Sequence, residues 1–419
     1  MAAVHEDPVA FVALAIAVVL VVAKLGGELA ERVGQPAVLG ELVAGVVLGN
    51  LSLLGFGGLE RIESETTVNT LAGLGVLILL FQVGLESSVG EMLKVGPSSL
   101  LVAILGVAAP FALGWGVGAW LMPHASGYLH AFLGATLCAT SVGITARVLE
   151  DLGRSKSPEA RVIVGAAVID DVLGLVILSA VSGVILAADR GGSVSAATVL
   201  LPLAKAIGFL AVALIAGVYL SPRLFAAASR FRGRGTLLAL GLTLCLVLAW
   251  ASSLIGLAPI VGAFAAGLIL EPAHYRALVE RDGHALEDLI HPIGSFLIPI
   301  FFVLMGMHTD LKAFAQPGVI GLASALTVAA ILGKQVCSLG VLGGAADRLT
   351  VGIGMIPRGE VGLIFANIGL SLAVAGERIV DGAEFSAIVV MVIVTTLVTP
   401  PALKWSLGRQ RTTRAPTSQ

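Results

Sequence analysis

Long apolar segments recur along the whole chain, and they constrain the fold more than any other feature. A helix that crosses the hydrocarbon core of a bilayer needs about 20 mainly apolar residues. Composition agrees with such helices, because 57% of the 419 residues are hydrophobic, only 12% are charged and the mean hydropathy is +1.00. The sequence predicts an all-α polytopic membrane protein with about thirteen transmembrane helices. The expected spans lie near residues 8–24, 36–54, 67–85, 97–121, 128–150, 159–187, 197–221, 235–256, 258–271, 287–307, 317–345, 349–375 and 384–405.

The loops between these segments differ in charge, and this difference gives the chain a direction across the membrane. Short cytoplasmic loops are enriched in Lys and Arg. If thirteen spans start from an outside N-terminus, eighteen of the 25 basic residues fall inside and four outside. The other three, Lys205, Lys334 and Arg358, lie within spans. We therefore expect a multi-pass protein of the plasma (inner) membrane, with the N-terminus outside and the C-terminus cytoplasmic.

Two adjacent carboxylates, Asp170 and Asp171, interrupt the apolar stretch VGAAVIDDVLGLVIL. A charged side chain at the centre of a membrane helix costs on the order of 3 kcal/mol on insertion scales. Asp170 follows Arg161 by about 14 Å of helix, which places the pair near the middle of the bilayer. Neighbouring helix positions point about 100° apart, so the two carboxylates cannot share one partner on one face. We expect one to face a neighbouring helix and the other to face a cavity.

Lys334, in the segment AAILGKQVCSLG, is the expected counter-charge. Desolvation favours the uncharged amine unless a carboxylate lies beside it. A structural ion pair between two helices is the simpler interpretation, but it accounts for only one of the two Asp residues. By default, an ionisable residue left over inside a membrane marks an ion or proton pathway.

Two of the spans contain clusters of residues that interrupt helices. Span 5 holds Thr140, Ser141 and Gly143, and span 12 holds the run Pro357–Glu360. Proline removes a backbone donor, and small polar side chains can satisfy the carbonyls that are freed. Spans 2–6 and 9–13 form two five-helix sets in inverted orientation, and each interruption has one more span after it. Matched interruptions in inverted repeats predict two crossed discontinuous helices at a midplane binding site.

These motifs also carry a family resemblance. The stretch VIDDVLGL, residues 168–175, is similar to the paired-Asp motif of electrogenic antiporters, whereas electroneutral relatives carry Asn before Asp. The chain thus resembles the monovalent cation/proton antiporter superfamily, specifically its bacterial electrogenic sodium/proton antiporter branch. Further similar stretches, in chain order, are PAVLGELVAGVVLGN, LGVLILLFQVGLE, TSVGITARVLEDLG, GAFAAGLIL, FFVLMGM and IPRGEVGLIFA.

The resemblance implies two domains that are each built from separate parts of the chain. Spans 1–3 and 8–10 would form a dimerisation domain, and spans 4–6 and 11–13 a transport core. Span 7 would link them, and a cytoplasmic tail would follow the core. The expected boundaries are 1–96 and 229–312 for the dimerisation domain, 97–190 and 313–405 for the core, 191–228 for the linker and 406–419 for the tail. A homodimer within membrane lipid is expected, with no nucleic acid as partner.

The resemblance also implies roles for individual residues. Asp171 would bind Na⁺ and exchange it for protons, while Asp170 would pair with Lys334, which is a candidate second proton carrier. The helix crossing would contain Thr140, Ser141, Pro357 and Gly359. For Arg358 and Glu360, a structural role as supporting charges is favoured over a role in transport.

The sequence therefore predicts a secondary transporter and not an enzyme. It would exchange Na⁺ or Li⁺ for protons by alternating access, electrogenically, and contribute to pH homeostasis. It would need no cofactor beyond the transported Na⁺ and H⁺. Two alternatives stay open: a K⁺/H⁺ antiporter, and a sodium-coupled symporter of organic solutes. The second would need a roomy polar cavity.

Overall fold

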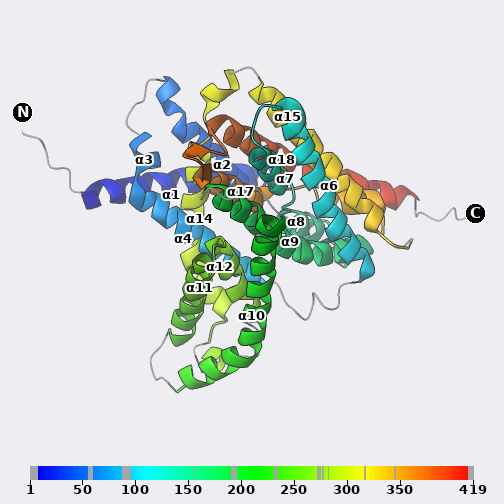
Figure 1. The fold of residues 1–419 in the computed structure, drawn as a ribbon. Coiled ribbons are helices and arrows are strands. Elements are labelled where there is room, and N and C mark those ends of the chain that lie inside the picture. The colour runs from blue at the N-terminus through cyan, green and yellow to red at the C-terminus, as the bar shows by residue number, and fades with distance from the viewer. Residues whose placement is uncertain are drawn as a thin grey trace, which may run out of the picture. The chain divides into compact units, whose positions relative to one another are not determined.

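The chain folds almost entirely into helices (Figure 1). The computed structural model describes residues 8–54, 60–86, 96–154, 156–189, 196–230, 235–270, 275, 278–281, 283–315, 318–343 and 346–413. Contacts between residues divide the chain into two compact units. Unit 1 contains Met1–Glu31, Gly40–Gly90 and Ser195–His308, and unit 2 contains Arg32–Leu39, Glu91–Val194 and Thr309–Gln419.

This division groups most of the segments predicted for the transport core into unit 2. Most of those predicted for the dimerisation domain lie in unit 1, and so does the predicted linker helix. The roles of the two units in dimerisation and transport stay predictions.

Unit 1 is assembled from helices that approach each other at glycines. Helix α4 packs against α12 and α14, and α11 packs against α12. Glycine allows such close approach because no side chain separates the two backbones. The helices are α1 (Pro8–Arg32), α2 (Ala37–Gly49), η1 (Leu51–Leu54), α3 (Glu60–Ser64), α4 (Thr66–Glu86), α10 (Ala196–Ala228), α11 (Thr236–Leu254), α12 (Pro259–Leu268) and α14 (Leu286–Met307).

Unit 2 is organised around α6 and α18. Helix α6 packs against α7, α9 and α15, and α18 packs against α15, α16 and α17. The first part comprises α6 (Pro97–Leu121), α7 (Gly127–Thr136), α8 (Val142–Asp151) and α9 (Pro158–Asp189). The second comprises η2 (Leu311–Ala315), α15 (Val319–Val336), η3 (Cys337–Gly340), α16 (Arg348–Gly354), α17 (Gly359–Ser371), β1 (Ala373–Val374), β2 (Glu377–Arg378) and α18 (Gly382–Thr413).

The prediction of a polytopic helical fold is confirmed. In the part of the chain that the structure describes, nine helices are long and apolar enough to span a membrane. Three shorter apolar helices, Ala37–Gly49, Pro259–Leu268 and Val361–Ser371, accompany them. The interruptions predicted for spans 5 and 12 are both present, as the gaps between α7 and α8 and between α16 and α17. A total of thirteen membrane crossings stays a prediction.

Several span boundaries differ from the prediction, and α1, α10 and α18, for example, extend seven or eight residues beyond the expected ends, to Arg32, Ala228 and Thr413. Span 11 was expected to reach residue 345, but α15 ends at Val336 and continues as η3 only to Gly340. Span 12 was expected to reach residue 375, but α17 ends at Ser371, and β1 and β2 form an antiparallel pair after it. The turn between these strands holds Ala375 and Gly376 at φ of 54° and 84°. Two successive positive φ angles are typical of the tight turns that join hairpin strands.

The start of α16 is fixed by two carboxylates. Asp347 caps the helix, because its side chain accepts the backbone N–H of Thr350 at 3.0 Å. Glu159, near the start of α9, accepts the N–H of Asp347 itself at 3.0 Å. Such a cap satisfies donors that a helix N-terminus leaves without partners. These bonds attach the first part of the interrupted α16–α17 pair to α9.

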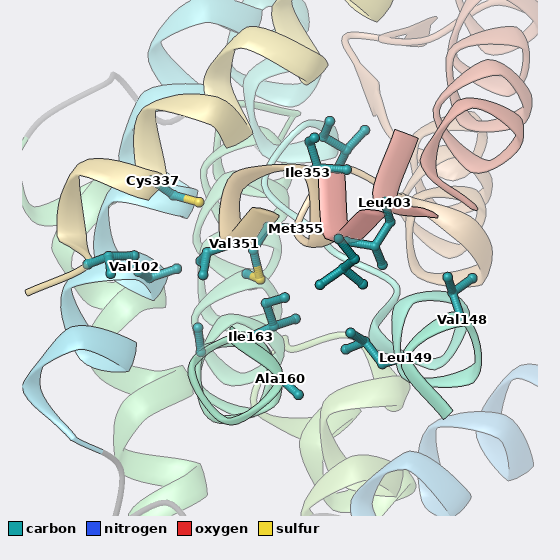
Figure 2. Close-up of a cluster of buried hydrophobic side chains, with 14 of the residues drawn as sticks. Val102, Val148, Leu149, Ala160, Ile163, Cys337, Val351, Ile353, Met355 and Leu403 are labelled. Carbon is teal, nitrogen blue, oxygen red and sulfur yellow. The ribbon is translucent and has the colours of Figure 1, made fainter. Parts of the chain in front are cut away.

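A cluster of buried apolar side chains packs around the interrupted helices in unit 2. Figure 2 shows Ala160 and Ile163 of α9 beside Val351 and Met355. The packing is close, because a Cβ atom added at Gly354 would lie 2.5 Å from Cδ1 of Ile163. This cluster, which also includes side chains from α6, α8, η3 and α18, holds the interruptions in place.

The glycine contacts in unit 1 predict a stability difference between two positions on one helix. A Cβ at Gly84 would meet the Phe264 carbonyl oxygen and lie 3.0 Å from Cα of Gly267, whereas a Cβ at Gly73 would meet no atom within 4 Å. We expect Gly84→Ala to destabilise the fold by about 1–3 kcal/mol, the usual cost of overpacking. Gly73→Ala should be neutral or slightly stabilising. Thermal denaturation in detergent compares the two midpoints, and equal shifts would contradict the close α4–α12 contact.

Candidate functional site

The two interrupted helix pairs of unit 2 meet at their gaps. Residues 137–141 separate α7 from α8, and residues 355–358 separate α16 from α17. The backbone N–H of Ser141 in the first gap donates to the carbonyl of Pro357 in the second, at 2.8 Å. The crossing of discontinuous helices is therefore a direct backbone contact.

Hydroxyl groups from one pair satisfy carbonyls freed in the other. Thr145 Oγ1 donates to the carbonyl of Gly354 at 2.6 Å, and Thr140 Oγ1 donates to that of Met355 at 3.4 Å. Both acceptors lie where α16 ends, so they have no partner within their own helix. The sequence predicted this function for Thr140 but did not single out Thr145.

Gly359 is required where α17 begins. Its φ is +45°, and a Cβ atom there would lie 2.6 Å from both Cβ and Oγ of Ser141. Ser141 is itself buried, at 1% exposure. Any other residue would combine backbone strain with a steric clash. The predicted positions Ser141, Pro357 and Gly359 thus lie together at the crossing.

Two buried cationic side chains bind consecutive backbone carbonyls that have no helical partner because α7 is interrupted there. Lys334 Nζ donates to the carbonyl of Cys138 at 2.7 Å, and Arg358 Nη1 donates to that of Ala139. Arg358 Nη2 also donates to the carbonyl of Ala330 at 3.1 Å. The C-terminal end of α7 carries partial negative charge, which favours cations there. Arg358 thus connects the two gaps with α15, and its structural role stays a prediction.

Asp170 completes the arrangement. Its Oδ1 and Oδ2 lie 3.0 Å and 3.2 Å from Lys334 Nζ, and both side chains are fully buried. The hydroxyl of Thr140 has one proton, which it can donate to the Asp170 carboxylate in place of the long bond to the Met355 carbonyl. The structure thus brings Asp170, Lys334 and Thr140 together with both gaps. The separation of the two carboxylates is also visible, because Asp170 is buried whereas Asp171 is partly exposed.

Glycine also positions α6 beside the ion pair, which the sequence did not indicate. A Cβ at Gly106 would lie 3.5 Å from Lys334 Nζ and 3.7 Å from Asp170 Oδ1. Gly333, next to Lys334, lies against Pro110 of α6, since a Cβ there would be 2.8 Å from Cα of Pro110. The remaining predicted residue, Glu360, belongs to α17, but its side chain lies outside the described part of the structure.

The buried pair predicts a specific pattern of stability losses. Removing one partner leaves an uncompensated buried charge, at a cost of about 3–5 kcal/mol, whereas neutral groups in both positions avoid this penalty. We expect Asp170→Asn and Lys334→Gln each to lower the thermal denaturation midpoint in detergent at neutral pH, and the double variant to recover much of the loss. Lys312→Gln, at an exposed lysine of the same unit, is the matched control. Additive losses in the double variant would contradict the pairing.

Comparisons with known proteins identify the family. A family model described as "Sodium/hydrogen exchanger, transmembrane" matches residues 3–408. The high-affinity Na⁺/H⁺ antiporter NhaS3 of Synechocystis sp. is 37% identical, over 94% of this chain and 89% of that relative. The Na⁺/H⁺-K⁺ antiporter GerN of Bacillus cereus is 36% identical, over 94% of this chain and 95% of that relative.

The fold is also similar to that of a solved antiporter. The sodium proton antiporter MjNhaP1 of Methanocaldococcus jannaschii matches with a TM-score of 0.69, over 97% of this chain and 99% of that chain, at 14% identity. At 14% identity this likeness shows the fold alone. The family model and the two relatives above also show the class of activity. The protein is a multi-pass cation/proton exchanger rather than an enzyme, and it belongs to the transmembrane sodium/hydrogen exchanger family.

Proposed function

We propose that this protein exchanges Na⁺ for protons electrogenically, with Asp171 as the site for which the two ions compete. The observation that carries the proposal is the difference between two neighbouring carboxylates. Asp170 is fully buried against Lys334, while Asp171 is partly exposed one position further along α9. One carboxylate is thus neutralised within the protein, and the partial exposure of the other supports it as the side chain that would meet an ion.

Competition follows from the chemistry of a partly desolvated carboxyl group. Desolvation favours the protonated, neutral form, and a bound cation favours the ionised form. Carboxylate, hydroxyl and backbone oxygens are suitable ligands for hard cations, and Thr140 and Ser141 lie at the adjacent crossing. Asp171 would therefore release a proton when Na⁺ binds and regain one when Na⁺ leaves.

The second proton would come from Lys334. Four ionisable side chains of this region lie in the described part of the structure, namely Asp170, Asp171, Lys334 and Arg358, and with all of them charged the formal charges of these four cancel. A Na⁺ ion adds one positive charge to a buried site, where uncompensated charge is costly. Release of a proton from Lys334 restores neutrality. Two protons would then move for each Na⁺, so each cycle transfers net charge.

Alternating access would complete the cycle. In transporters with discontinuous helices, one part of the molecule moves as a largely rigid body against another around a fixed site. The backbone and side-chain bonds across the crossing support such movement as a unit, because they join α7, α9, α15 and α16–α17. An empty and charged site is costly to move through the membrane, so transport would require one of the two ions.

Potassium is a second candidate cation. GerN, which is 36% identical to this chain, is named as a Na⁺/H⁺-K⁺ antiporter. Oxygen ligands accept Na⁺, Li⁺ and K⁺, and selection among them depends on the size of the site. We also propose a homodimer in the plasma membrane, with the N-terminus outside. The excess of basic residues in the expected inside loops supports this orientation.

Transport in proteoliposomes that contain a pH dye tests the proposal. We expect addition of Na⁺ to alkalinise an acid-loaded lumen, faster when the membrane potential is clamped so that charge cannot accumulate. With one net charge per cycle, a potential of 100 mV contributes about 2.3 kcal/mol, or roughly 50-fold in the equilibrium Na⁺ ratio. A parallel series with Li⁺ and K⁺ determines the ion preference. Proton movement with none of these cations would contradict the proposal.

Variants separate the roles of the two charged residues. Asp171→Asn should reduce exchange to the rate of empty liposomes, because it removes the shared binding site. Lys334→Gln should retain some exchange but lose its response to the membrane potential and change its pH profile. Lys312→Gln is the control and should match the parent protein. If Lys334→Gln stays electrogenic with an unchanged pH profile, Lys334 is not a proton carrier.

A further inference from the structure

Four buried serine and threonine hydroxyls lack a hydrogen-bond partner among the described residues, those of Ser179, Ser182, Ser221 and Thr396, and α9 carries two of them. Serine and threonine inside a helix commonly donate to a carbonyl three or four residues earlier. Here Thr136 donates to Phe132, Thr395 to Met391 and Ser252 to Ala249, all at 2.8–2.9 Å. Ser179 and Ser182 are 1% and 6% exposed, yet their hydroxyls have no hydrogen-bond partner among the described residues.

An unpaired buried hydroxyl requires an explanation, since it loses its bonds to water without replacing them. Helices α6, α7, α8 and α16 and strand β1 pack against α9, but no group in the described residues bonds either serine. A second conformation in which water reaches both hydroxyls would supply the missing bonds. The protein class to which the chain belongs alternates between conformations that open to opposite sides.

The positions of the serines along α9 connect them with the ion site. Ser182 follows Asp171 by about 17 Å of helix and is rotated from it by only about 20°, so the two share a face. Ser179 lies between them along the helix axis, about one turn before Ser182, and is rotated from Asp171 by about 80°. Asp189, a further two turns along, returns to the face of Asp171. It is exposed at the end of α9, where its Oδ1 accepts the N–H of Ala375 at 2.9 Å.

We propose that Ser179 and Ser182 line the route by which water and the transported ions pass between Asp171 and the C-terminal end of α9. The route is closed in this conformation and hydrated in the alternate one. A hydroxyl suits both states, because it is small enough to be buried and offers an oxygen to water or to an alkali cation. This inference rests on the proposed exchange at Asp171 and adds the residues that connect that site with one side of the membrane.

Thiol labelling tests whether water reaches these positions. Ser182→Cys is compared with Val176→Cys, because both native side chains lie on α9 and are 6% exposed, but they differ by about 120° around the helix. The full chain in proteoliposomes is treated with a charged, membrane-impermeant methanethiosulfonate reagent, with and without Na⁺, at acidic and alkaline pH. The unaltered chain measures the background from its three buried cysteines. Such reagents need a hydrated thiolate.

We expect Ser182→Cys to react several-fold faster than Val176→Cys in at least one condition, and the ratio of the two rates to change with Na⁺ or pH, since pH alone changes the thiolate fraction of both. Equal, background-level reaction of both variants in every condition would overturn the inference, provided that both still exchange ions. If the parent chain does not exchange Na⁺ for protons but Ser182→Cys reacts, the proposed function fails while the water route stands.

Removal of the hydroxyl gives a second measurement that does not depend on labelling. Ser182→Ala should raise the thermal denaturation midpoint, because it removes an unpaired buried group, and should also slow exchange. Ser182→Thr keeps the hydroxyl and should restore most of the rate. Val176→Ala is the control on the other face, and it should lower the midpoint through lost packing without slowing exchange to the same degree. A Ser182→Ala variant with the parent exchange rate would contradict a role on the route.

Discussion

The contact between Lys334 and Asp170 determines much of the structure of unit 2. Two fully buried charges at 3.0 Å stabilise each other only if their remaining bonding capacity is also used. Lys334 therefore needs a further acceptor, and the interruption after α7 supplies it as the carbonyl of Cys138. The same interruption leaves the next carbonyl, that of Ala139, without a helical partner, and Arg358 from the opposite gap donates to it. The ion pair and the two helix gaps are consequently one arrangement, in which each part removes an unsatisfied group that another part creates.

This arrangement gives two adjacent and chemically identical side chains different surroundings. The rotation of about 100° between neighbouring helix residues directs Asp170 towards Lys334 and leaves Asp171 partly exposed. The cations also differ in kind. Arginine keeps its charge in proteins, whereas lysine loses its proton more readily when it is desolvated. In the proposed cycle Arg358 is thus a permanent charge that holds the crossing, and Lys334 is the group whose charge can change.

The sequence predicted those parts of the fold whose causes are local. Apolar length predicted the helical segments, Pro357 and the small polar residues predicted the gaps, and two charges in apolar surroundings predicted the contact of Lys334 with a carboxylate. Other parts of the fold depend on backbone carbonyl groups, which every residue has. The partners of Arg358 are backbone carbonyls of Ala139 and Ala330, which have no sequence signal. The hairpin after α17 depends on a left-handed Ala375, a conformation that alanine rarely adopts.

The glycines of unit 2 show a further limit of sequence reasoning, because their function depends on a neighbour far away in the chain. Gly106 and Gly333 are ordinary residues of apolar helices when the sequence is read alone. In the fold, Gly106 lies against the ion pair, and Gly333 lies against Pro110 of α6. Close approach of α6 and α15 excludes other groups from the surroundings of Lys334, so its bonds are restricted to Asp170 and the backbone. The charged residues determine the chemistry of the site. The absence of a side chain at Gly106 and at Gly333 lets α6 approach the ion pair closely, and this close approach affects how strongly the two charges interact.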